Sequence, residues 1–217
     1  MRKINRRSLP HLIDCAVGWL YGCYYTAWAR VFARWWGVKV EAGCRFYGLP
    51  MLRRLPASTI HIGRDCVFRS APWSSLAGIS RRCILATVGE HAQIRVGEGC
   101  GLSGAVISAA TEIILGRRVM VGANSTITDT DWHPLDPIAR AAGMPGATAA
   151  VRIEDDVWLG FNVLVLKGVT IGEGTTVAAN SVVVNSLPAG VMAAGAPARV
   201  IRVIGSPQKE STREAAQ

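Results

Sequence analysis

The sequence lacks the residue clusters that mark metal enzymes. Its six cysteines include no CxxC pair, and no two of its four histidines lie closer than thirty positions, so neither residue type has the spacing of a zinc site. Charged residues make up only 18% of the chain, whereas hydrophobic residues make up 50%. This composition excludes an extended disordered protein, because burial of so much apolar surface offsets the cost of ordering the chain. We expect a folded domain that requires no metal ion.

A hydrophobic run long enough to cross a membrane is also missing. Residues 15–29 are uncharged, but this stretch of fifteen residues, bounded by Asp14 and Arg30, falls short of the ~20 apolar residues that a spanning helix needs. The basic start, residues 1–7, leads into an apolar segment without a small-residue cleavage site. We therefore predict no cleavable signal peptide and a cytoplasmic location, where cysteines stay reduced.

Positive charge and aromatic residues concentrate near the N-terminus. Residues 1–54 hold ten of the 24 basic and two of the 15 acidic residues, so the rest of the chain is nearly neutral. Residues 11–36 are rich in Trp and Tyr, and we predict a helical segment at 1–37. In one hypothesis this helix packs against the main domain or a neighbouring subunit. In the other, residues 1–36 contact the inner membrane face peripherally, with aromatic rings at headgroup level and cations on anionic lipid.

A repeat of six residues decides the fold. Every sixth residue from 153 to 183 is aliphatic, and the residue four positions after each of the first five is small or β-branched. A helix cannot place every sixth residue on one face, because 3.6 residues per turn rotate successive members apart. A β-solenoid can, with one short strand and one turn per hexad. The inward residues would be Ile153, Leu159, Val165, Ile171, Val177 and Val183.

The hexads extend toward the N-terminus in shifted registers, which indicates short insertions at the corners. We predict a solenoid domain at 38–205, interrupted by a loop at 128–152, closed by a cap at 186–205 and followed by a disordered tail at 206–217. A cap is expected because the last coil would otherwise expose a strand edge. Four cysteines occupy the small-residue position of a hexad and are predicted to be buried structural thiols: Cys44, Cys66, Cys83 and Cys100.

The loop that interrupts the hexads carries the candidate chemistry. Long loops inside a compact repeat are usually functional, and this one contains His133, the only histidine in the repeat-bearing half of the chain. An imidazole that titrates near neutral pH can take the proton of an acceptor hydroxyl or amine while that group attacks an acyl thioester. Asp129 or Asp131 could orient the ring or hold the acceptor. The alternative is a surface loop in which these residues only make turns.

The order of these motifs closely resembles the hexapeptide-repeat acyltransferase family. The similarity is to the maltose, galactoside and nodulation-factor O-acetyltransferase group, and most of all to acetyltransferases associated with surface polysaccharides. It covers roughly residues 94–204. The motifs that carry it are, in chain order, residues 122–127, 129–136, 153–160, 169–172 and 193–201, with 101–105 resembling the polysaccharide-associated branch.

This resemblance implies an all-β main domain folded as a left-handed parallel β-helix and joined to the N-terminal helical segment. It further implies a homotrimer with active sites between neighbouring chains, acetyl-CoA along the prism, and His133 as the catalytic base. Ser103 is a further candidate acceptor contact near the His133 loop. Trp158 could instead be a packing residue at the rim, and the arginines could be solvated charges. The positions that match the cofactor contacts of the family are Trp158, Gly160, Phe161, Ala179, Arg199 and Arg202.

Two departures from the family pattern bear on the substrates. Residues 184–185 are Val-Asn where the sugar acetyltransferases often have Thr-Lys, and residues 1–36 do not resemble their acceptor-binding helices. We therefore expect a CoA-dependent O-acetyltransferase that acts on a sugar hydroxyl in bacterial surface-polysaccharide or glycolipid biosynthesis, rather than on free maltose or galactoside.

Two alternatives remain open. N-acetylation of an amino sugar or of a serine-type small acceptor is the same chemical step with another nucleophile, and a non-catalytic hexapeptide scaffold would keep the prism without the reaction. The γ-type carbonic anhydrases share the prism, but they need three histidines around zinc, which this sequence does not group. Nucleic-acid binding is disfavoured because the repeat region shows no basic stripe with interleaved aromatic residues.

Overall fold

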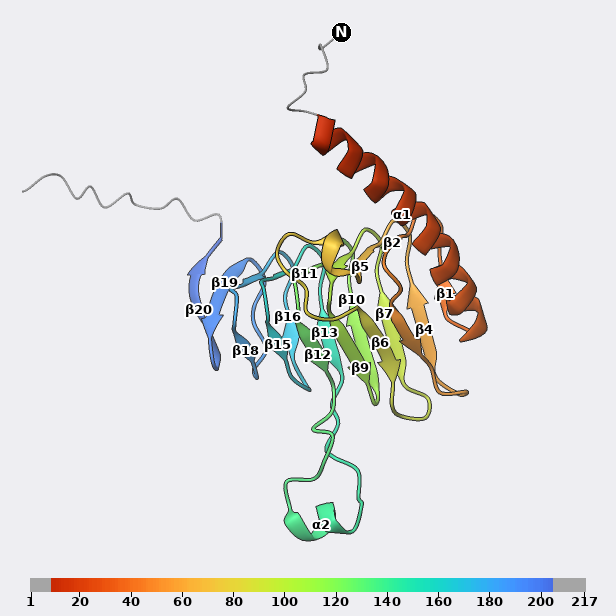
Figure 1. The fold of residues 1–217 in the computed structure, drawn as a ribbon. Coiled ribbons are helices and arrows are strands. Elements are labelled where there is room, and N and C mark those ends of the chain that lie inside the picture. Colours follow the sequence, from red (N-terminus) through yellow and green to blue (C-terminus); the bar gives the residue numbers. More distant parts are fainter. Residues whose placement is uncertain (1–8, 205–217) are drawn as a thin grey trace, which may run out of the picture.

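The computed structural model describes residues 9–204, and most of them form a three-sided solenoid of short parallel strands (Figure 1). Each side is one sheet, named here A, B or C, and successive strands of the chain move from sheet to sheet. The predicted parallel β-solenoid is confirmed. Every strand pairing is parallel except the last one, between β19 and β20.

The three sheets are built as follows. Sheet A contains β1 (Lys39–Val40), β4 (Thr59–Ile62), β7 (Gln93–Val96), β10 (Glu112–Leu115), β13 (Val151–Ile153) and β16 (Thr170–Ile171). Sheet B contains β2 (Arg45–Tyr47), β5 (Val67–Arg69), β8 (Gly101–Ser103), β11 (Met120–Val121), β14 (Trp158–Leu159), β17 (Thr176–Val177), β19 (Val191–Gly195) and β20 (Ala198–Val203). Sheet C contains β3 (Met51–Arg53), β6 (Ile84–Thr87), β9 (Val106–Ala109), β12 (Thr126–Thr128), β15 (Leu164–Val165) and β18 (Val182–Val183).

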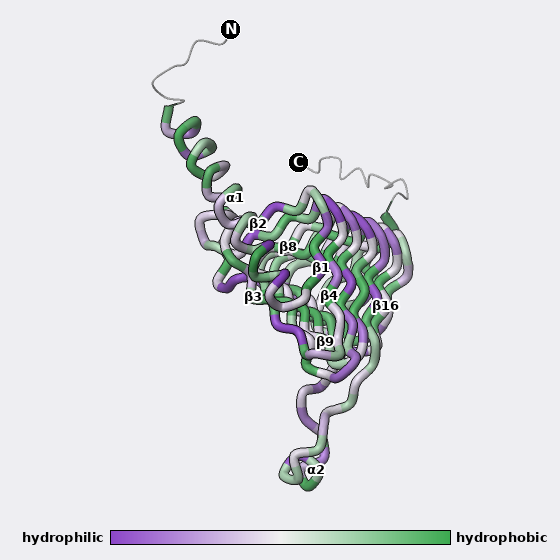
Figure 2. The backbone as a smooth tube through the Cα atoms, turned by 90° about the vertical axis from the view of Figure 1, so that its right-hand side faces the viewer, coloured by the Kyte–Doolittle hydropathy of each residue, from purple (hydrophilic) through white to green (hydrophobic). Residues whose placement is uncertain are grey.

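The hexad residues form the core of the solenoid. All six predicted inward residues between 153 and 183 are fully buried, and the residues four positions later are buried beside them at the corners. Figure 2 shows the result as hydrophobic stripes that repeat from coil to coil. Because strands so short have few hydrogen bonds each, this continuous apolar column provides the main stabilisation of the prism.

The four solenoid cysteines are free and buried, as predicted. Three of them stack at the corner between sheets A and B, where each thiol donates a hydrogen bond to a glycine carbonyl. These bonds run from Cys44 to Gly63, from Cys66 to Gly97 and from Cys100 to Gly116, with S···O distances of 3.0–3.1 Å. Hydrogen bonding among the stacked thiols, together with burial, raises the pKa of Cys66 to about 12, so this thiol stays protonated near neutral pH.

A hairpin closes the C-terminal end of the prism. Strand β20 pairs antiparallel with β19 at the edge of sheet B, and Figure 1 shows it covering the last coil. This is the position predicted for the cap, and it removes an open edge that would favour association of strands between chains. The predicted tail, residues 206–217, lies outside the residues that the structure describes, as do residues 1–8.

Helix α1 (Leu9–Trp35) lies against the N-terminal coil and extends beyond it (Figure 1). Its buried residues are small, Gly22, Ala29 and Ala33, so the helix backbone approaches strands β1 and β2 closely. A short 3₁₀ helix, η1 (Pro72–Ser74), brings Trp73 against Tyr21 of α1, with ring centroids 5.4 Å apart. Among the described residues no helix is long and apolar enough to cross a membrane.

The interrupting loop leaves the prism where strand β12 ends and returns where β13 begins, at the corner between sheets C and A. Figures 1 and 2 show it projecting well away from the coils. It contains one short helix, α2 (Pro137–Ala141), whose first turn is capped by Asp136 through hydrogen bonds from the backbone of Ile138 and Ala139.

Candidate active site

The neck of the loop is held in a defined geometry around His133. The backbone N–H of His133 donates to the carbonyl of Asp131 at 2.7 Å, and Asp131 forms an ion pair with Lys167 at 2.7 Å. The two arms of the loop come very close here, since a Cβ placed on Gly146 would lie 2.8 Å from the backbone nitrogen of His133. Glycine at position 146 therefore allows the arms to pack.

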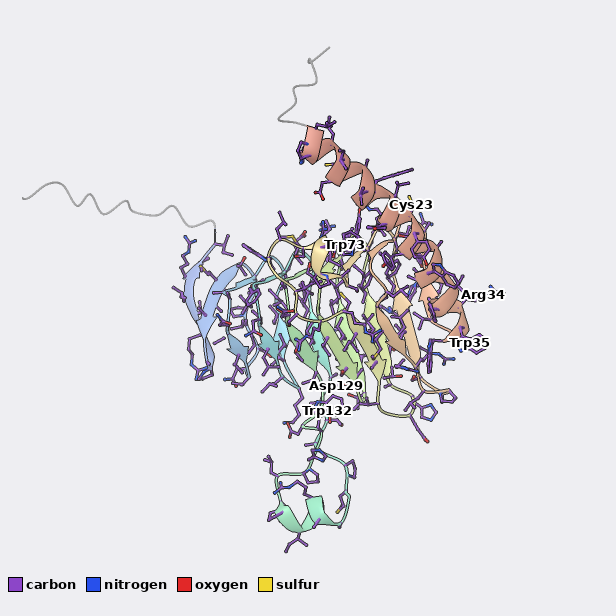
Figure 3. All side chains as sticks on the ribbon, in the orientation of Figure 1. Cys23, Arg34, Trp35, Trp73, Asp129 and Trp132 are labelled. Atoms are coloured by element: carbon purple, nitrogen blue, oxygen red, sulfur yellow. The ribbon has the colours of Figure 1, made fainter. Side chains whose placement is uncertain are left out.

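Asp129 and Asp131, both predicted to orient His133 or hold the acceptor, have other partners in the structure. The carboxylate of Asp129 is fully buried and accepts hydrogen bonds from the backbone N–H groups of Ala110 and Thr111 at 2.6 and 2.7 Å. Figure 3 places Asp129 at the base of the loop and Trp132 just beyond it. Asp129 thus anchors the loop to the preceding coil, while Asp131 positions the neck through Lys167.

The imidazole of His133 is exposed at the surface of the loop. Within residues 9–204 its ring atoms make no hydrogen bond, whereas its backbone is fixed on both sides as described. The imidazole is thus open to a ligand that approaches from outside the chain.

Three of the six predicted cofactor residues, Trp158, Arg199 and Arg202, lie on strands of sheet B. Register pairs Met120 with Trp158, Trp158 with Thr176, Thr176 with Met192, and Met192 with Arg202. Directly paired residues point to the same face, so these five residues form one outward row, named here the sheet-B row. Three strand spacings of about 4.8 Å put Arg202 about 14 Å from Trp158. The part of the row from Trp158 to Arg202 thus has an aromatic side chain at one end and a guanidinium at the other.

The corner between sheets B and C holds the other predicted cofactor residues. Phe161 and Ala179 are exposed there, but Gly160 is buried. A Cβ on Gly160 would lie 2.7 Å from the backbone nitrogen of Ala179, so Gly160 lets two coils stack. That Gly160 lines the ligand channel stays a prediction. Arg199 lies on β20, is exposed and donates to the carbonyl of Ala198.

Ser103 lies on the same outer face in a shallow groove. The groove is lined by strands β5, β8 and β11 together with Trp158, and Arg69 lies beside Ser103 through the pairing of β5 with β8. Ser103 thus lies in the groove that Trp158, one of the predicted cofactor residues, also lines. Ser103 is not near His133 in sequence or by strand pairing: strand β8 belongs to sheet B, whereas the loop leaves the corner between sheets C and A.

Within one chain the predicted site residues therefore occupy different edges of the prism. His133 projects from the corner between sheets C and A, while Trp158, Ser103 and Arg202 belong to sheet B. The structure places the predicted cofactor residues on sheet B and at its corner with sheet C, and does not bring His133 to them within one chain.

The acidic run that precedes Trp158 is already paired. Hydrogen bonds from the backbone and side chain of Arg117 hold the pKa of Asp155 below its usual value, and Arg118 does the same for Asp156. These carboxylates are thus poor candidates for a general base. Nowhere in the described part of the chain do three or more His, Cys, Asp or Glu side chains gather as they would around a metal ion.

Sequence reasoning missed two features of the site. One is Lys167, which follows the inward residue Val165 at the corner directly beside the loop and pairs with Asp131. The other is the excursion of residues 70–82, which Asn124 holds by accepting from Ser80 and donating to Gly78. Numbering the hexads would have placed Lys167 at the corner from which the loop leaves. The excursion of residues 70–82 interrupts the repeat, so no periodic pattern predicts where it lies.

Comparisons with known proteins identify relatives of the repeat region and of the fold. Residues 150–185 match the family model described as "Bacterial transferase hexapeptide (six repeats)". Over 94 residues, 43% of this chain and 44% of the relative, the sequence is 44% identical to the galactoside O-acetyltransferase of Lactococcus lactis. Over 68 residues, 31% of this chain and 28% of the relative, it is 48% identical to the 2,3,4,5-tetrahydropyridine-2,6-dicarboxylate N-acetyltransferase of Clostridium perfringens. The matched part spans less than half of each of these relatives.

A solved structure shows the same architecture over most of the chain. A variant of AntD, an N-acyltransferase from Bacillus cereus in complex with dTDP-4-amino-4,6-dideoxyglucose and coenzyme A, aligns with a TM-score of 0.60. The alignment covers 82% of this chain and 89% of that one at 17% identity, and it therefore speaks to the fold alone. The chain is a hexapeptide-repeat protein with a left-handed β-helix fold, similar in sequence and architecture to the hexapeptide-repeat acyltransferases.

Proposed function

We propose that this protein is a CoA-dependent O-acetyltransferase that transfers an acetyl group from acetyl-CoA to a sugar hydroxyl. The observation that carries the proposal is that the chain has both parts such a reaction needs. The loop presents the exposed imidazole of His133, and the sheet-B row suits an elongated, phosphate-bearing ligand. The sequence match to a galactoside O-acetyltransferase supports the choice of a sugar hydroxyl.

The sheet-B row fits acetyl-CoA in shape and charge. Trp158 is 49% exposed and offers an apolar surface for the acyl arm, with Phe161 exposed close by. Arg202 ends the row on the same face, and Arg199 lies on the same strand, where guanidinium groups can bind phosphate oxygens in a forked geometry. The regular face between the two ends is preformed, so binding requires little rearrangement.

In the proposed reaction His133 acts as the base. Its neutral imidazole takes the proton of the acceptor hydroxyl while the oxygen attacks the thioester carbonyl, and a backbone N–H stabilises the oxyanion. The carbon–sulfur bond then breaks, and the CoA thiolate takes the proton from the imidazolium. The products are the acetyl ester and free CoA. Both substrates are bound together, so no covalent acyl-enzyme is needed.

The active site is proposed to form between chains of a homotrimer. His133 and the sheet-B row occupy different edges of one prism, so His133 of one chain would face the row of its neighbour. A trimer would have about three times the chain mass of 23.2 kDa by light scattering after size exclusion. A monomer that is fully active would contradict the proposal.

The experiment that tests the function directly replaces His133. We expect His133→Ala to lower turnover by about 10² or more, because general-base catalysis is lost, with CoA thiol release as the measurement. The matched control is His91→Asn, since His91 is exposed with φ of +62° and Asn tolerates that conformation. Full acetyl transfer by His133→Ala would disprove the mechanism.

A specific observation favours one second candidate, transfer to nitrogen. A 68-residue stretch of this chain is 48% identical to an N-acetyltransferase, and the chemical step is the same. A pair of acceptors that differ only in a hydroxyl or an amino group at one position separates the two reactions. If the protein is instead a non-catalytic scaffold, acetyl-CoA should not bind to it. Calorimetry measures that binding.

The acceptor is proposed to belong to surface-polysaccharide or glycolipid assembly, with peripheral membrane contact through residues 1–36. Support comes from α1, whose outward side carries large exposed apolar residues along its whole length. An apolar face flanked by cations such as Arg34 suits an anionic lipid interface. Flotation with vesicles of phosphatidylglycerol and phosphatidylcholine tests it: the full chain should float, and a chain that begins at residue 37 should not.

A further inference from the structure

A groove between α1 and strand β2 has no role in the chemistry described so far. It has a volume of about 440 Å³ and is bounded by Trp19, Cys23 and Ala27 of the helix and by Tyr47 of the strand. Gly22 also lines it, at the point where the helix packs against Tyr47: a Cβ at position 22 would lie 2.9 Å from the ring of Tyr47. Thr26 accepts a hydrogen bond from the backbone of Phe46 and so fixes the helix to the strand. The groove is therefore a built feature with mainly apolar walls.

Two guanidinium groups lie at the edge of this groove. Arg30 comes from α1, where its side chain also donates to the carbonyl of Glu41 at 3.2 Å, and Arg45 comes from β2. No acidic side chain lines the groove, and within the described residues Arg45 takes part in no ion pair. The charge complement of such a site is an anion attached to an apolar group.

The groove adjoins the one beside the proposed active site. Register pairs Arg45 with Val67 and Tyr47 with Arg69, and Val67 and Arg69 line the next groove together with Ser103 and Trp158. The guanidinium of Arg69 lies 5.2 Å from the ring centre of Tyr47, which links the two. Arg45 is four strand spacings from Trp158, or about 19 Å along one face. A ligand held at α1 could thus extend a polar end toward the row that would hold the acyl group.

Helix α1 also presents an apolar surface beside this groove. Trp19 is 68% exposed and Leu20 58% exposed, and the side chain of Trp35 lies at the far end of the helix (Figure 3). A lipid chain leaving the groove along α1 would cover these apolar side chains with apolar substance.

We propose that this groove binds the lipid phosphate of a lipid-linked sugar, which places the sugar over the grooved face of sheet B. The inference rests on the proposed function for the identity of the sugar as acceptor. The apolar chain would lie against Trp19 and Ala27, the phosphate would receive hydrogen bonds from Arg30 and Arg45, and the saccharide would run past Arg69 toward Ser103. The continuity of the two grooves is what favours a lipid-linked saccharide over a phospholipid without a sugar.

The test measures binding of small soluble probes to the full chain without acetyl-CoA. Geranyl phosphate carries a chain and a phosphate, geraniol only the chain, and inorganic phosphate only the charge. We expect geranyl phosphate to bind at least tenfold more tightly than either part. Arg45→Gln should weaken its binding about tenfold, because a charge-assisted hydrogen bond is lost. Ala27→Trp, at an exposed helix position, should fill the groove and abolish binding.

Controls separate this inference from the proposed reaction. Arg95→Gln removes an exposed cation of sheet A, outside the groove, and should bind geranyl phosphate as the unmodified chain does, and so should His133→Ala. Unchanged binding in both Arg45→Gln and Ala27→Trp would overturn the assignment. Equally tight binding of a short-chain phosphatidylglycerol would also overturn it and would indicate a general phospholipid site. If the probes do not bind while thiol release still depends on His133, the inference fails and the proposed function stands.

Discussion

The prism and helix α1 use apolar residues in opposite ways. In the prism the aliphatic residues of each hexad point inward and are fully buried, and the net charge after residue 54 is close to zero. In α1 the buried residues are small, while Trp, Tyr and Leu side chains are exposed beside arginines. The apolar surface of the prism thus forms its own core, whereas much of the apolar surface of α1 is left exposed in the single chain.

The largest difference is expected in thiol reactivity. Cys15 and Cys23 of α1 are exposed, and the four solenoid cysteines are buried. For Cys66 a pKa raised from 9.0 to about 12 alone lowers the thiolate fraction about a thousandfold, and the thiolate is the reactive form. Native protein at pH 7 should release chromophore from a disulfide reagent at two thiols quickly, and denatured protein at all six. Rapid reaction of more than two thiols in the native state would break the comparison.

Truncation of leucine should separate the regions by free energy of unfolding. Leu159 is fully buried in β14, and Leu20 is exposed on α1. Leu159→Ala should lower the free energy of unfolding by roughly 2–5 kcal/mol through lost burial and a cavity, whereas Leu20→Ala should change it by less than about 0.5 kcal/mol. Urea denaturation at matched protein concentration measures both. Equal losses would mean that α1 buries Leu20 in a contact absent from the single chain.

A smaller difference, opposite in sign, is expected for glycine. A Cβ at Gly160 would meet the backbone of Ala179 at 2.7 Å, while a Cβ at Gly18 of α1 meets nothing within 4 Å. Gly160→Ala should therefore destabilise the prism by roughly 1–3 kcal/mol through overpacking. Gly18→Ala should stabilise the protein by about 0.5–1 kcal/mol, because alanine is the better helix former. Thermal melts of both variants measure these changes in stability. A loss of stability in Gly18→Ala would show that another part of the protein packs against this face of the helix.

Periodic features of the fold were predictable from the sequence. The spacing from Ile153 to Val183 predicted the inward column, the break at residue 128 predicted an inserted loop, and the cysteines at small-residue positions were predicted to be buried; all three are seen. These predictions succeed because each position of a hexad has one environment that repeats in every coil.

The contacts that the sequence did not predict are those that join different coils. Asp129 binds the backbone at positions 110 and 111, 18–19 residues earlier, and Gly160 packs against Ala179 of the next coil. The shifted registers indicate that corner insertions exist, but not which residues of neighbouring coils they bring into contact. The roles of His133, Ser103 and the arginines remain predictions.

The central claim is that catalysis requires His133 of one chain and the sheet-B row of another, and a mixing experiment tests it most directly. His133→Ala and Trp158→Ala should each lose most of the acetyl-transfer activity when expressed alone. Co-expressed in equal amounts, they should regain about a quarter of the unmodified activity, because random assembly leaves about one interface in four, counted over all trimers, with an intact His133 facing an intact Trp158. A mixture no more active than the separate variants would contradict the account.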